Sequence, residues 1–239
     1  MGHLRAEQLI QYRFINLHRR LQNFEMLASL VSPHRRTRQT PWEIHSSAHR
    51  LFIRVVFRME WYNKRRFGDL AHDAARLHGD REALVFEDQR YSFNQQAQQI
   101  DRAAKALIAS GVEHGDHVAL WLNNCANWVF ISFALAKVGA VMVPINTRFR
   151  TNDLDYVLRQ SDSRMLITHD TSGPIRYLDM VREVVELPSS GESVDDPNFP
   201  ELKRIMITDE VDANGIMTWT SALEASEAIS DDTLAKRVD

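Results

Sequence analysis

Residues 79–150 read GDREALVFEDQRYSFNQQAQQIDRAAKALIASGVEHGDHVALWLNNCANWVFISFALAKVGAVMVPINTRFR, and the order of patterns in this stretch decides the fold class. Ser92 and Gln95 have the spacing of a capping box, in which each side chain bonds a free backbone N–H of the first helical turn. An apolar stripe at helical spacing follows and ends at Gly111, a residue typical of a left-handed helix cap. Three patterns come next, of a strand, a helix and a strand, at residues 117–122, 126–138 and 141–144. This order predicts parallel strands joined by a covering helix.

The flanking segments continue the alternation. Residues 69–78 suit a short helix, and residues 83–87 and 90–93 suit a hairpin that turns at Asp88-Gln89. Further helices are predicted at residues 151–160, 174–185 and 220–228, a loop at 187–200, and strands at 165–168 and 204–208. The chain is therefore predicted to have an α/β fold, with a layered, largely parallel sheet and flanking helices.

The charges are divided unevenly along the chain, although the net charge is only −3. Residues 1–66 hold 13 Lys or Arg and 4 Asp or Glu, a balance of +9, whereas residues 67–239 hold 16 and 28, a balance of −12. The acidic part would repel phosphates, which argues against nucleic acid as a partner. A hydrophobic share of 44% and a mean hydropathy of −0.35 exclude the disordered and fibrous classes.

The cysteine content and the apolar runs indicate in which cellular compartment the protein is expected. The single cysteine, Cys125, excludes an internal disulfide and a cysteine-rich metal site, and fits a reducing cytosol. No secretory signal is visible. The longest apolar run, residues 128–145, is interrupted by Lys137, Gly139 and Pro144, so a buried helix followed by a buried strand is expected in place of a membrane span. We expect a cytoplasmic protein.

Residues 1–66 are predicted to be a basic, helical extension that precedes the acidic domain of residues 67–239. Apolar residues recur at helical spacing in residues 4–30, with arginines between them, and residues 51–57 form a second apolar run. A basic amphipathic segment can lie on an anionic membrane surface. An extension that packs on the chain's own body or on a partner is favoured, as is an N-terminus assigned too far upstream. A mitochondrial transit peptide fits less well, because the segment contains Glu7 and Glu25 and little Ser.

Four patches of sequence occur in an order and spacing typical of one enzyme family. They are Arg90-Tyr91-Ser92-Phe93 with Gln95, the run GDHVAL at 115–120, the run KVGAVMVPIN at 137–146, and Thr151-Asn152-Asp153-Leu154 with Tyr156 and Ser161. Together they resemble the N-terminal portion of the AMP-forming acyl-CoA synthetases, of the fatty-acid–CoA ligase type within the adenylate-forming ligase superfamily. The resemblance implies a ligase that joins a carboxylic or fatty acid to ATP as an acyl-adenylate, releases pyrophosphate and transfers the acyl group to CoA. ATP, CoA and Mg²⁺ are the cofactors that it implies for the full-length enzyme.

The phosphate-binding loop of that family is not found in residues 1–239. The family's loop is rich in Ser, Thr and Gly and ends in Pro-Lys, whereas the nine glycines of this chain are scattered. Residues 171–174 imitate its first letters, but Ile175-Arg176-Tyr177 follow, so a turn into a helix is predicted there. The family's Lys-bearing C-terminal domain is not found in these residues either. We therefore expect a fragment of an acyl-CoA synthetase that is inactive alone and binds none of the three cofactors tightly.

The sequence is compatible with two other functions. The chain could be a non-catalytic interaction module or a subunit of a split enzyme, because an incomplete sheet exposes an edge that a partner chain can cover. It could also act at a membrane surface through residues 1–66.

No residue is predicted to be catalytic, no cofactor-binding residue is assigned, and no metal site is predicted. For Asn146 and Arg148, which follow a strand, fixing a turn is favoured over facing substrate or CoA. Cys125 precedes a helix, and a capping role is favoured over a nucleophile. The remaining candidates are predicted to be surface histidines or solvated loop carboxylates: His45, His49, His114, His117, Asp195, Asp196, Asp231 and Asp232.

Overall fold

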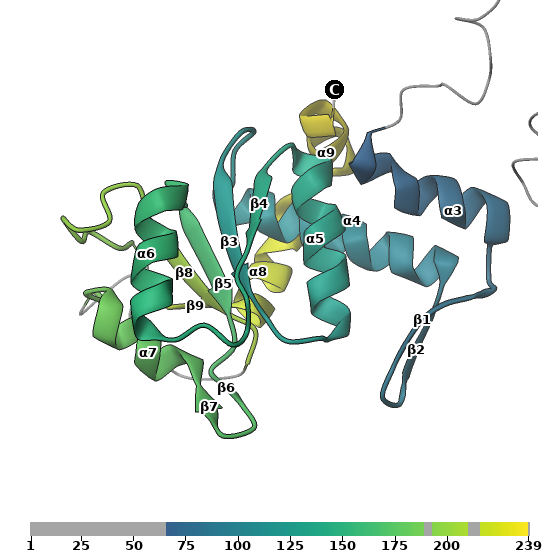
Figure 1. Cartoon of the computed structure of the whole chain (residues 1–239). Coiled ribbons are helices and arrows are strands. Elements are labelled where there is room, and N and C mark those ends of the chain that lie inside the picture. Colours follow the sequence, from purple (N-terminus) through teal and green to yellow (C-terminus); the bar gives the residue numbers. More distant parts are fainter. Residues whose placement is uncertain (1–65, 189–192, 210–215, 239) are drawn as a thin grey trace, which may run out of the picture. The chain divides into compact units, whose positions relative to one another are not determined.

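The computed structural model describes residues 66–188, 193–209 and 216–238 (Figure 1). The predicted basic extension, including the helical pattern of residues 4–30 and the pair His45 and His49, lies outside the described residues, apart from Arg66. Among the described residues, no helix is long and apolar enough to span a bilayer.

Helices and strands alternate along most of the described chain. The helices are η2 (Phe67–Asp69), α3 (Leu70–His78), α4 (Phe93–Ala109), α5 (Ala126–Val138), α6 (Thr151–Ser161), α7 (Tyr177–Val184), α8 (Trp219–Ala225), η3 (Ser226–Ala228) and α9 (Asp231–Val238). The strands are β1 (Glu82–Phe86), β2 (Gln89–Ser92), β3 (His117–Trp121), β4 (Val141–Pro144), β5 (Met165–Thr168), β6 (Thr171–Ser172), β7 (Ile175–Arg176), β8 (Arg204–Ile207) and β9 (Met217–Thr218).

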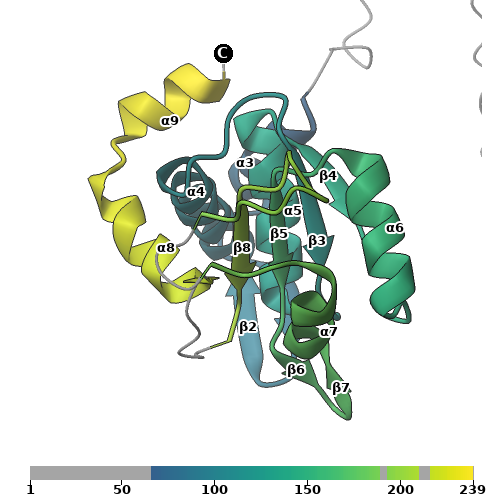
Figure 2. The same ribbon diagram turned by 90° about the vertical axis from the view of Figure 1, so that its left-hand side faces the viewer.

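A five-stranded sheet in the order β4-β3-β5-β8-β9 forms the centre, and all of its neighbouring strands are parallel. Helices cover both faces of it: α4, α5 and α8 lie on one face, and α6 and α7 on the other (Figures 1 and 2). The predicted α/β fold with a largely parallel sheet is confirmed. Two small hairpins, β1-β2 and β6-β7, stand outside this sheet.

Alternating side chains of the strands divide the hydrophobic core in two. In β3, Val118 and Leu120 enter the core under α4 and α5, while Ala119 and Trp121 enter the core under α6 and α7. All four are fully buried. This period of two, with both faces apolar, explains why the strand reads as an uninterrupted apolar run.

Helix α4 begins and ends as the sequence predicts. The Ser92 backbone N–H donates to Gln95 Oε1 at 2.8 Å, and the Gln95 backbone N–H donates to Ser92 Oγ at 3.2 Å, which completes the capping box. Gly111 follows the helix with a φ of +82°, and buried Val112 donates its N–H to the Leu107 carbonyl at 3.0 Å. These contacts form the predicted left-handed cap.

Two local predictions are wrong, and two elements were not predicted. The first hairpin turns at Glu87-Asp88, one residue earlier than predicted, because Glu87 takes the left-handed conformation with a φ of 52°. Helix α7 begins at Tyr177 and not at Pro174, because Gly173, with a φ of +55°, turns the chain into the β6-β7 hairpin. Residues 217–218 and 231–238, for which no element was predicted, form β9 and α9.

Candidate functional site

A hollow of about 530 Å³ lies at the carboxyl edge of the central sheet. The loops after β3, β4, β5 and β8 all contribute to it, together with the turn of the β1-β2 hairpin. Its lining residues are Phe86, Glu87, Asn123, Asn124, Cys125, Thr147, His169, Thr171, Ser172 and Asp209. Ligands of open parallel sheets gather at this edge, so the hollow is the candidate site.

The Tyr177 hydroxyl ties together loops that border the hollow. It lies 3.0 Å from Asn123 Oδ1 and 3.2 Å from the Thr147 carbonyl oxygen, so its proton can be shared between the two acceptors. Asn123 in turn donates an amide N–H to Ser172 Oγ. These bonds connect the segments after β3, β4 and β5 and hold their backbones at fixed separations.

The Tyr177 ring is held in place by a contact with a second buried aromatic ring. Trp121, the last residue of β3, packs edge-on against Tyr177, with 4.6 Å between ring centroids and an interplanar angle of 90°. Both residues are fully buried. The indole N–H of Trp121 donates to the Asn146 carbonyl at 3.1 Å. Burial raises the pKa of the Tyr177 hydroxyl, so it stays protonated and donates throughout the neutral pH range.

Asn146 fixes the turn after β4. Its side-chain Oδ1 accepts the backbone N–H of Arg148 at 2.9 Å, an arrangement typical of an Asx turn. The predicted turn-fixing role of Asn146 is therefore confirmed. Arg148 takes part in the turn through its backbone.

Cys125 caps helix α5. Its Sγ accepts the Trp128 backbone N–H at 3.4 Å, and burial raises the pKa of the thiol. His114 and His117 lie at the other edge of the sheet, before or at the start of β3, where His117 Nδ1 is 2.5 Å from the Ser161 carbonyl oxygen. The predicted capping role is confirmed, and neither histidine can act as a base for this thiol.

The sequence interpretation missed His169 and Asp209, which follow β5 and β8 at the rim of the hollow. His169 Nδ1 lies 2.8 Å from Thr208 Oγ1 and 3.6 Å from Asp209 Oδ2. The Asp209 carboxylate also accepts the Asp170 backbone N–H at 2.5 Å. A usable signal was present, because polar residues directly after two adjacent parallel strands meet at one edge.

The lining of the hollow suits a neutral or weakly polar ligand. Amide and hydroxyl groups from Asn123, Asn124, Thr147, Thr171 and Ser172 can donate and accept hydrogen bonds. Among the described residues that line it, two are carboxylates, Glu87 and Asp209, and none is Lys or Arg. These residues do not fit a triphosphate, which requires cations or clustered backbone N–H groups.

The other predicted candidates lie elsewhere, and one of the carboxylates, Asp196, is not solvated as predicted. Asp196 is only 4% exposed, and it accepts the N–H groups of Glu186 and Asn198, both at 2.8 Å, so it is not a solvated loop charge. Asp231 begins helix α9 and does not lie in a loop, but its side chain is 95% exposed and therefore solvated as predicted, and it pairs with Lys105 at 2.7 Å. Within the described ranges, no three His, Cys, Asp or Glu side chains form a group that could hold a metal ion.

Comparison with known proteins identifies the family. The family model described as AMP-binding enzyme matches residues 71–235. The chain belongs to the AMP-binding enzymes. The match begins in α3 and ends in α9, so it covers the whole sheet and both helical layers.

Individual AMP-binding enzymes are about a third identical to this chain over the residues that align. The protein YngI of Bacillus subtilis (strain 168), an acyl-CoA synthetase by its name, is 32% identical over 175 residues, which are 72% of this chain and 32% of YngI. The crotonobetaine/carnitine–CoA ligase of Proteus mirabilis (strain HI4320) is 34% identical over 122 residues, 49% of this chain and 24% of that protein. The chain thus spans a third or less of the length of these relatives.

The solved structure of an anthranilate–CoA ligase, AuaEII, in complex with anthranoyl-AMP has the same fold. Its TM-score is 0.57 at 24% identity, over 67% of this chain and 28% of that one. The resemblance to the N-terminal portion of acyl-CoA synthetases is therefore shown, and so is the fold that it implied.

Proposed function

We propose that residues 67–239 are the N-terminal part of the AMP-binding domain of an acyl-CoA synthetase that acts on a fatty or related carboxylic acid. The observation that carries the proposal is the 32% identity with YngI over 175 residues, which span 32% of that protein. In the complete enzyme, a carboxylate oxygen attacks the α-phosphorus of ATP and pyrophosphate leaves. The CoA thiol then attacks the acyl carbon and AMP leaves. ATP, CoA and Mg²⁺ are the proposed cofactors of that enzyme.

We further propose that residues 1–239 alone do not form an acyl-adenylate. Two carboxylates and no described cation line the hollow at the carboxyl edge, so this part would repel a triphosphate. The scattered glycines provide no loop of backbone N–H groups for the phosphates. The contribution of this part is structural: it supplies a rigid sheet edge and the polar loops around Tyr177.

ATP–pyrophosphate exchange tests both proposals. The gene that encodes these residues should be expressed in full, and the intact mass of its product compared with 27.6 kDa, the mass of residues 1–239. Exchange is then measured with a panel of carboxylic acids. We expect acid-dependent exchange from the full product and only background exchange from residues 1–239. Exchange above background by residues 1–239 would contradict the second proposal, and no exchange with any acid by a longer full product would contradict the first.

The proposed location is the cytoplasm, and residues 1–66 are the proposed site of any contact with a membrane surface. Their balance of +9 supports attraction to anionic lipid. Salt-sensitive binding to anionic vesicles that is lost on deletion of residues 1–66 would support a membrane-peripheral protein. Equal vesicle binding by both forms would rule out this role for residues 1–66.

A further inference from the structure

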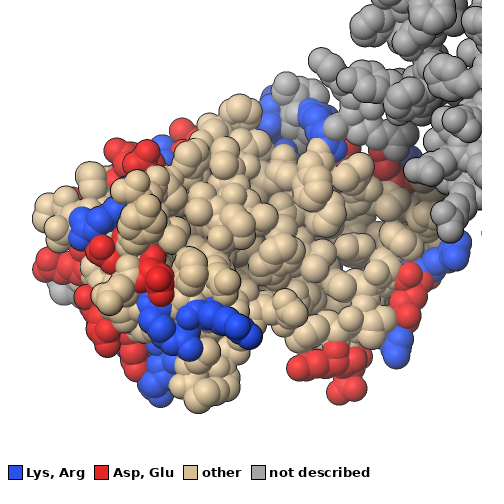
Figure 3. Space-filling model, viewed as in Figure 1, with Lys and Arg blue, Asp and Glu red and all other residues tan. Residues whose placement is uncertain are grey.

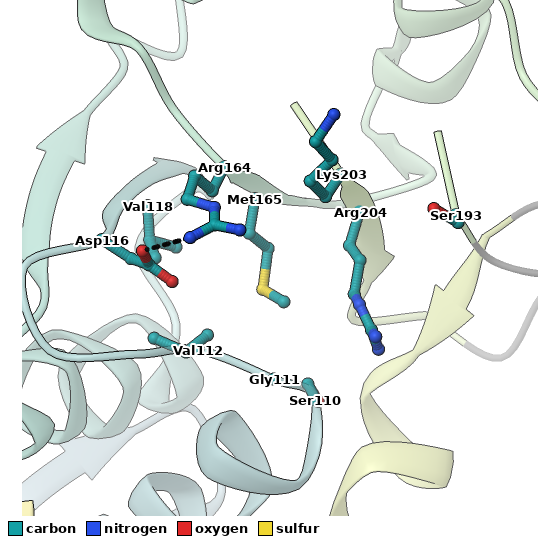
Figure 4. Close-up of a pocket in the computed structure, with 10 residues that line it drawn as sticks. All are labelled: Ser110, Gly111, Val112, Asp116, Val118, Arg164, Met165, Ser193, Lys203 and Arg204. Atoms are coloured by element: carbon teal, nitrogen blue, oxygen red, sulfur yellow. Dashed lines mark hydrogen bonds and ion pairs between the residues drawn. The ribbon is translucent and has the colours of Figure 1, made fainter. Parts of the chain in front are cut away.

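A second cavity lies at the amino edge of the central sheet, opposite the hollow at the carboxyl edge. Its volume is about 270 Å³, and it lies between the end of α4 and the starts of β3, β5 and β8 (Figure 4). Arg164, Lys203 and Arg204 line it, with Asp116 as the one carboxylate among the described lining residues. We call it the arginine pocket.

Strand pairing brings the three basic residues together. Met165 pairs with Arg204 in the parallel register of β5 and β8, which places Arg164 beside Lys203. The Arg164 carbonyl accepts the backbone N–H groups of both Lys203 and Arg204, at 2.8 and 3.2 Å. The basic cluster is therefore built into the sheet, and its backbone positions are fixed by the ladder.

The one carboxylate is already neutralised. Asp116 Oδ1 accepts from Arg164 at 3.1 Å, and Asp116 Oδ2 accepts the Glu113 backbone N–H at 2.8 Å. The Asp116 side chain is 10% exposed, whereas the Arg164 side chain is 45% exposed. A guanidinium has five N–H donors, so Arg164 keeps donors for a second anion.

The other two cations have no acidic partner among the described residues. The Lys203 ammonium donates to the Pro200 carbonyl at 2.6 Å, which leaves its charge uncompensated. The Arg204 guanidinium makes no hydrogen bond or ion pair with any described residue, and it lies close to Gly111, where a Cβ would be 3.5 Å from its Nη2. Three cations and one carboxylate leave a local charge of +2 in a domain whose balance is −12.

Two of the three basic side chains, those of Arg164 and Arg204, border the same space, and that of Lys203 does not (Figure 4). Figure 4 shows Arg164 directed at Asp116, with Met165 and Arg204 pointing into the cavity toward Gly111, while Lys203 points away to the rim. Two guanidiniums therefore flank the cavity, and Met165 forms an apolar wall between them. Guanidinium groups match the oxygen geometry of phosphate and bind it through paired hydrogen bonds.

We propose that the arginine pocket binds the phosphate group of a small, water-soluble ligand. Arg204 has no acidic partner among the described residues, Arg164 keeps free donors, and Lys203 adds a positive charge at the rim (Figure 4), so the lining attracts a phosphate anion. A volume of 270 Å³ lies just below the range of clefts that hold drug-sized ligands. The pocket is therefore large enough for the phosphate and only a short organic part. It is at the opposite edge of the sheet from the hollow, so this proposal does not depend on the proposed function.

Titration of the amide ¹H–¹⁵N spectrum of residues 1–239 tests the proposal. Inorganic phosphate and glycerol 3-phosphate are added separately, with sodium chloride at matched ionic strength as the reference. We expect saturable shifts of the Gly111, Arg164 and Arg204 amides with at least one of the two phosphates and not with chloride. Tighter binding of glycerol 3-phosphate would identify an organic phosphate as the ligand class, and equal binding would identify the bare anion.

Substitutions assign the binding to the two arginines. Arg204→Gln removes a guanidinium with no described ion pair, so the fold should be kept, and binding should weaken about tenfold. Arg102→Gln is the matched control: it removes the same charge from the exposed side of α4, about two turns before Ser110, and should leave binding unchanged. The proposal is overturned if neither phosphate gives saturable shifts, or if Arg204→Gln and Arg102→Gln bind phosphate equally.

Discussion

The two edges of the same parallel sheet carry opposite chemistry. At the carboxyl edge, amides, hydroxyls and two carboxylates surround a hollow whose loops are tied by one buried tyrosine. At the amino edge, three basic side chains and one carboxylate line the smaller arginine pocket. Figure 3 shows that on the face seen in Figure 1 the charged side chains gather at the periphery, and few lie over α5 and β4. The apolar middle of the strands separates the polar groups of the two edges, so the residues at one edge can change without contacting those at the other.

The carboxyl edge should be the part most sensitive to a single substitution, since it depends on Tyr177. Tyr177→Ala removes a fully buried ring and its contact with Trp121, and should lower the free energy of unfolding by about 4 kcal/mol. Tyr177→Phe removes only the hydroxyl that bridges Asn123 and Thr147, and should cost about 1 kcal/mol. Urea unfolding of both variants measures the difference.

Tyr156→Ala is the control for Tyr177→Ala. Tyr156 lies on α6 and is 65% exposed, so its removal should change stability by about 0.5 kcal/mol or less. If Tyr177→Phe destabilised the protein as much as Tyr177→Ala, the hydroxyl and not the ring would hold the edge together.

The amino edge should depend on glycine where the carboxyl edge depends on an aromatic ring. Gly139 ends α5 with a φ of +77°, and a Cβ there would lie 2.3 Å from Cδ2 of His114. Gly139→Ala adds this clash to the cost of a left-handed conformation and should destabilise by about 3 kcal/mol. Gly115→Ala has a similar φ of +85° and nothing within 4 Å, so it should cost about 1 kcal/mol.

Thermal unfolding of the two glycine variants separates steric from conformational cost. Combining Gly139→Ala with His114→Ala should recover part of the loss, because the clashing ring is removed. Equal destabilisation by Gly139→Ala and Gly115→Ala would show that His114 moves aside freely and contributes nothing to this edge.

A smaller effect is expected at Asp196, in the loop before β8. Its buried carboxylate accepts two backbone N–H groups, and Asp196→Asn replaces one acceptor oxygen by a donor. One N–H should then lose its partner, at a cost of about 2 kcal/mol. Asp195→Asn changes the neighbouring, exposed carboxylate and should have no measurable effect in the same denaturant titration.

The sequence predicted the sheet better than either of its edges. The bounds of α5, β4 and β5 are those predicted, because apolar runs of helix or strand length are bounded there by Gly, Pro or polar residues. The edges are built by loops, and loop geometry depends on backbone conformations that residue types signal weakly. Glu87 in the left-handed region is an example, since that conformation is uncommon for a residue other than glycine.

The candidate site was harder still to predict, because its parts are distant in sequence. Asn123, Thr147 and Tyr177 meet through hydrogen bonds that span 30 and 54 residues. The burial of Asp196 has no sequence signal, because no pattern shows that its loop folds back to the segment after α7, where it accepts the Glu186 N–H. The Asn146 turn and the Cys125 cap were predicted correctly, since both depend on neighbours within three residues.

The smallest expected effect concerns the reactivity of the hollow, through Cys125. Burial raises the pKa of this thiol, so less thiolate is present at neutral pH than in an exposed cysteine. Alkylation by iodoacetamide at pH 7.5 should therefore be a few-fold slower in the folded protein than in the same chain unfolded in urea, and the difference should shrink as pH rises above the thiol pKa. Cys125 is the only cysteine, so the mass gain reports this site alone. Faster alkylation of the folded form would mean that the N-terminus of α5 activates the thiol more than burial suppresses it, and the carboxyl edge would then be a reactive site and not only a binding surface.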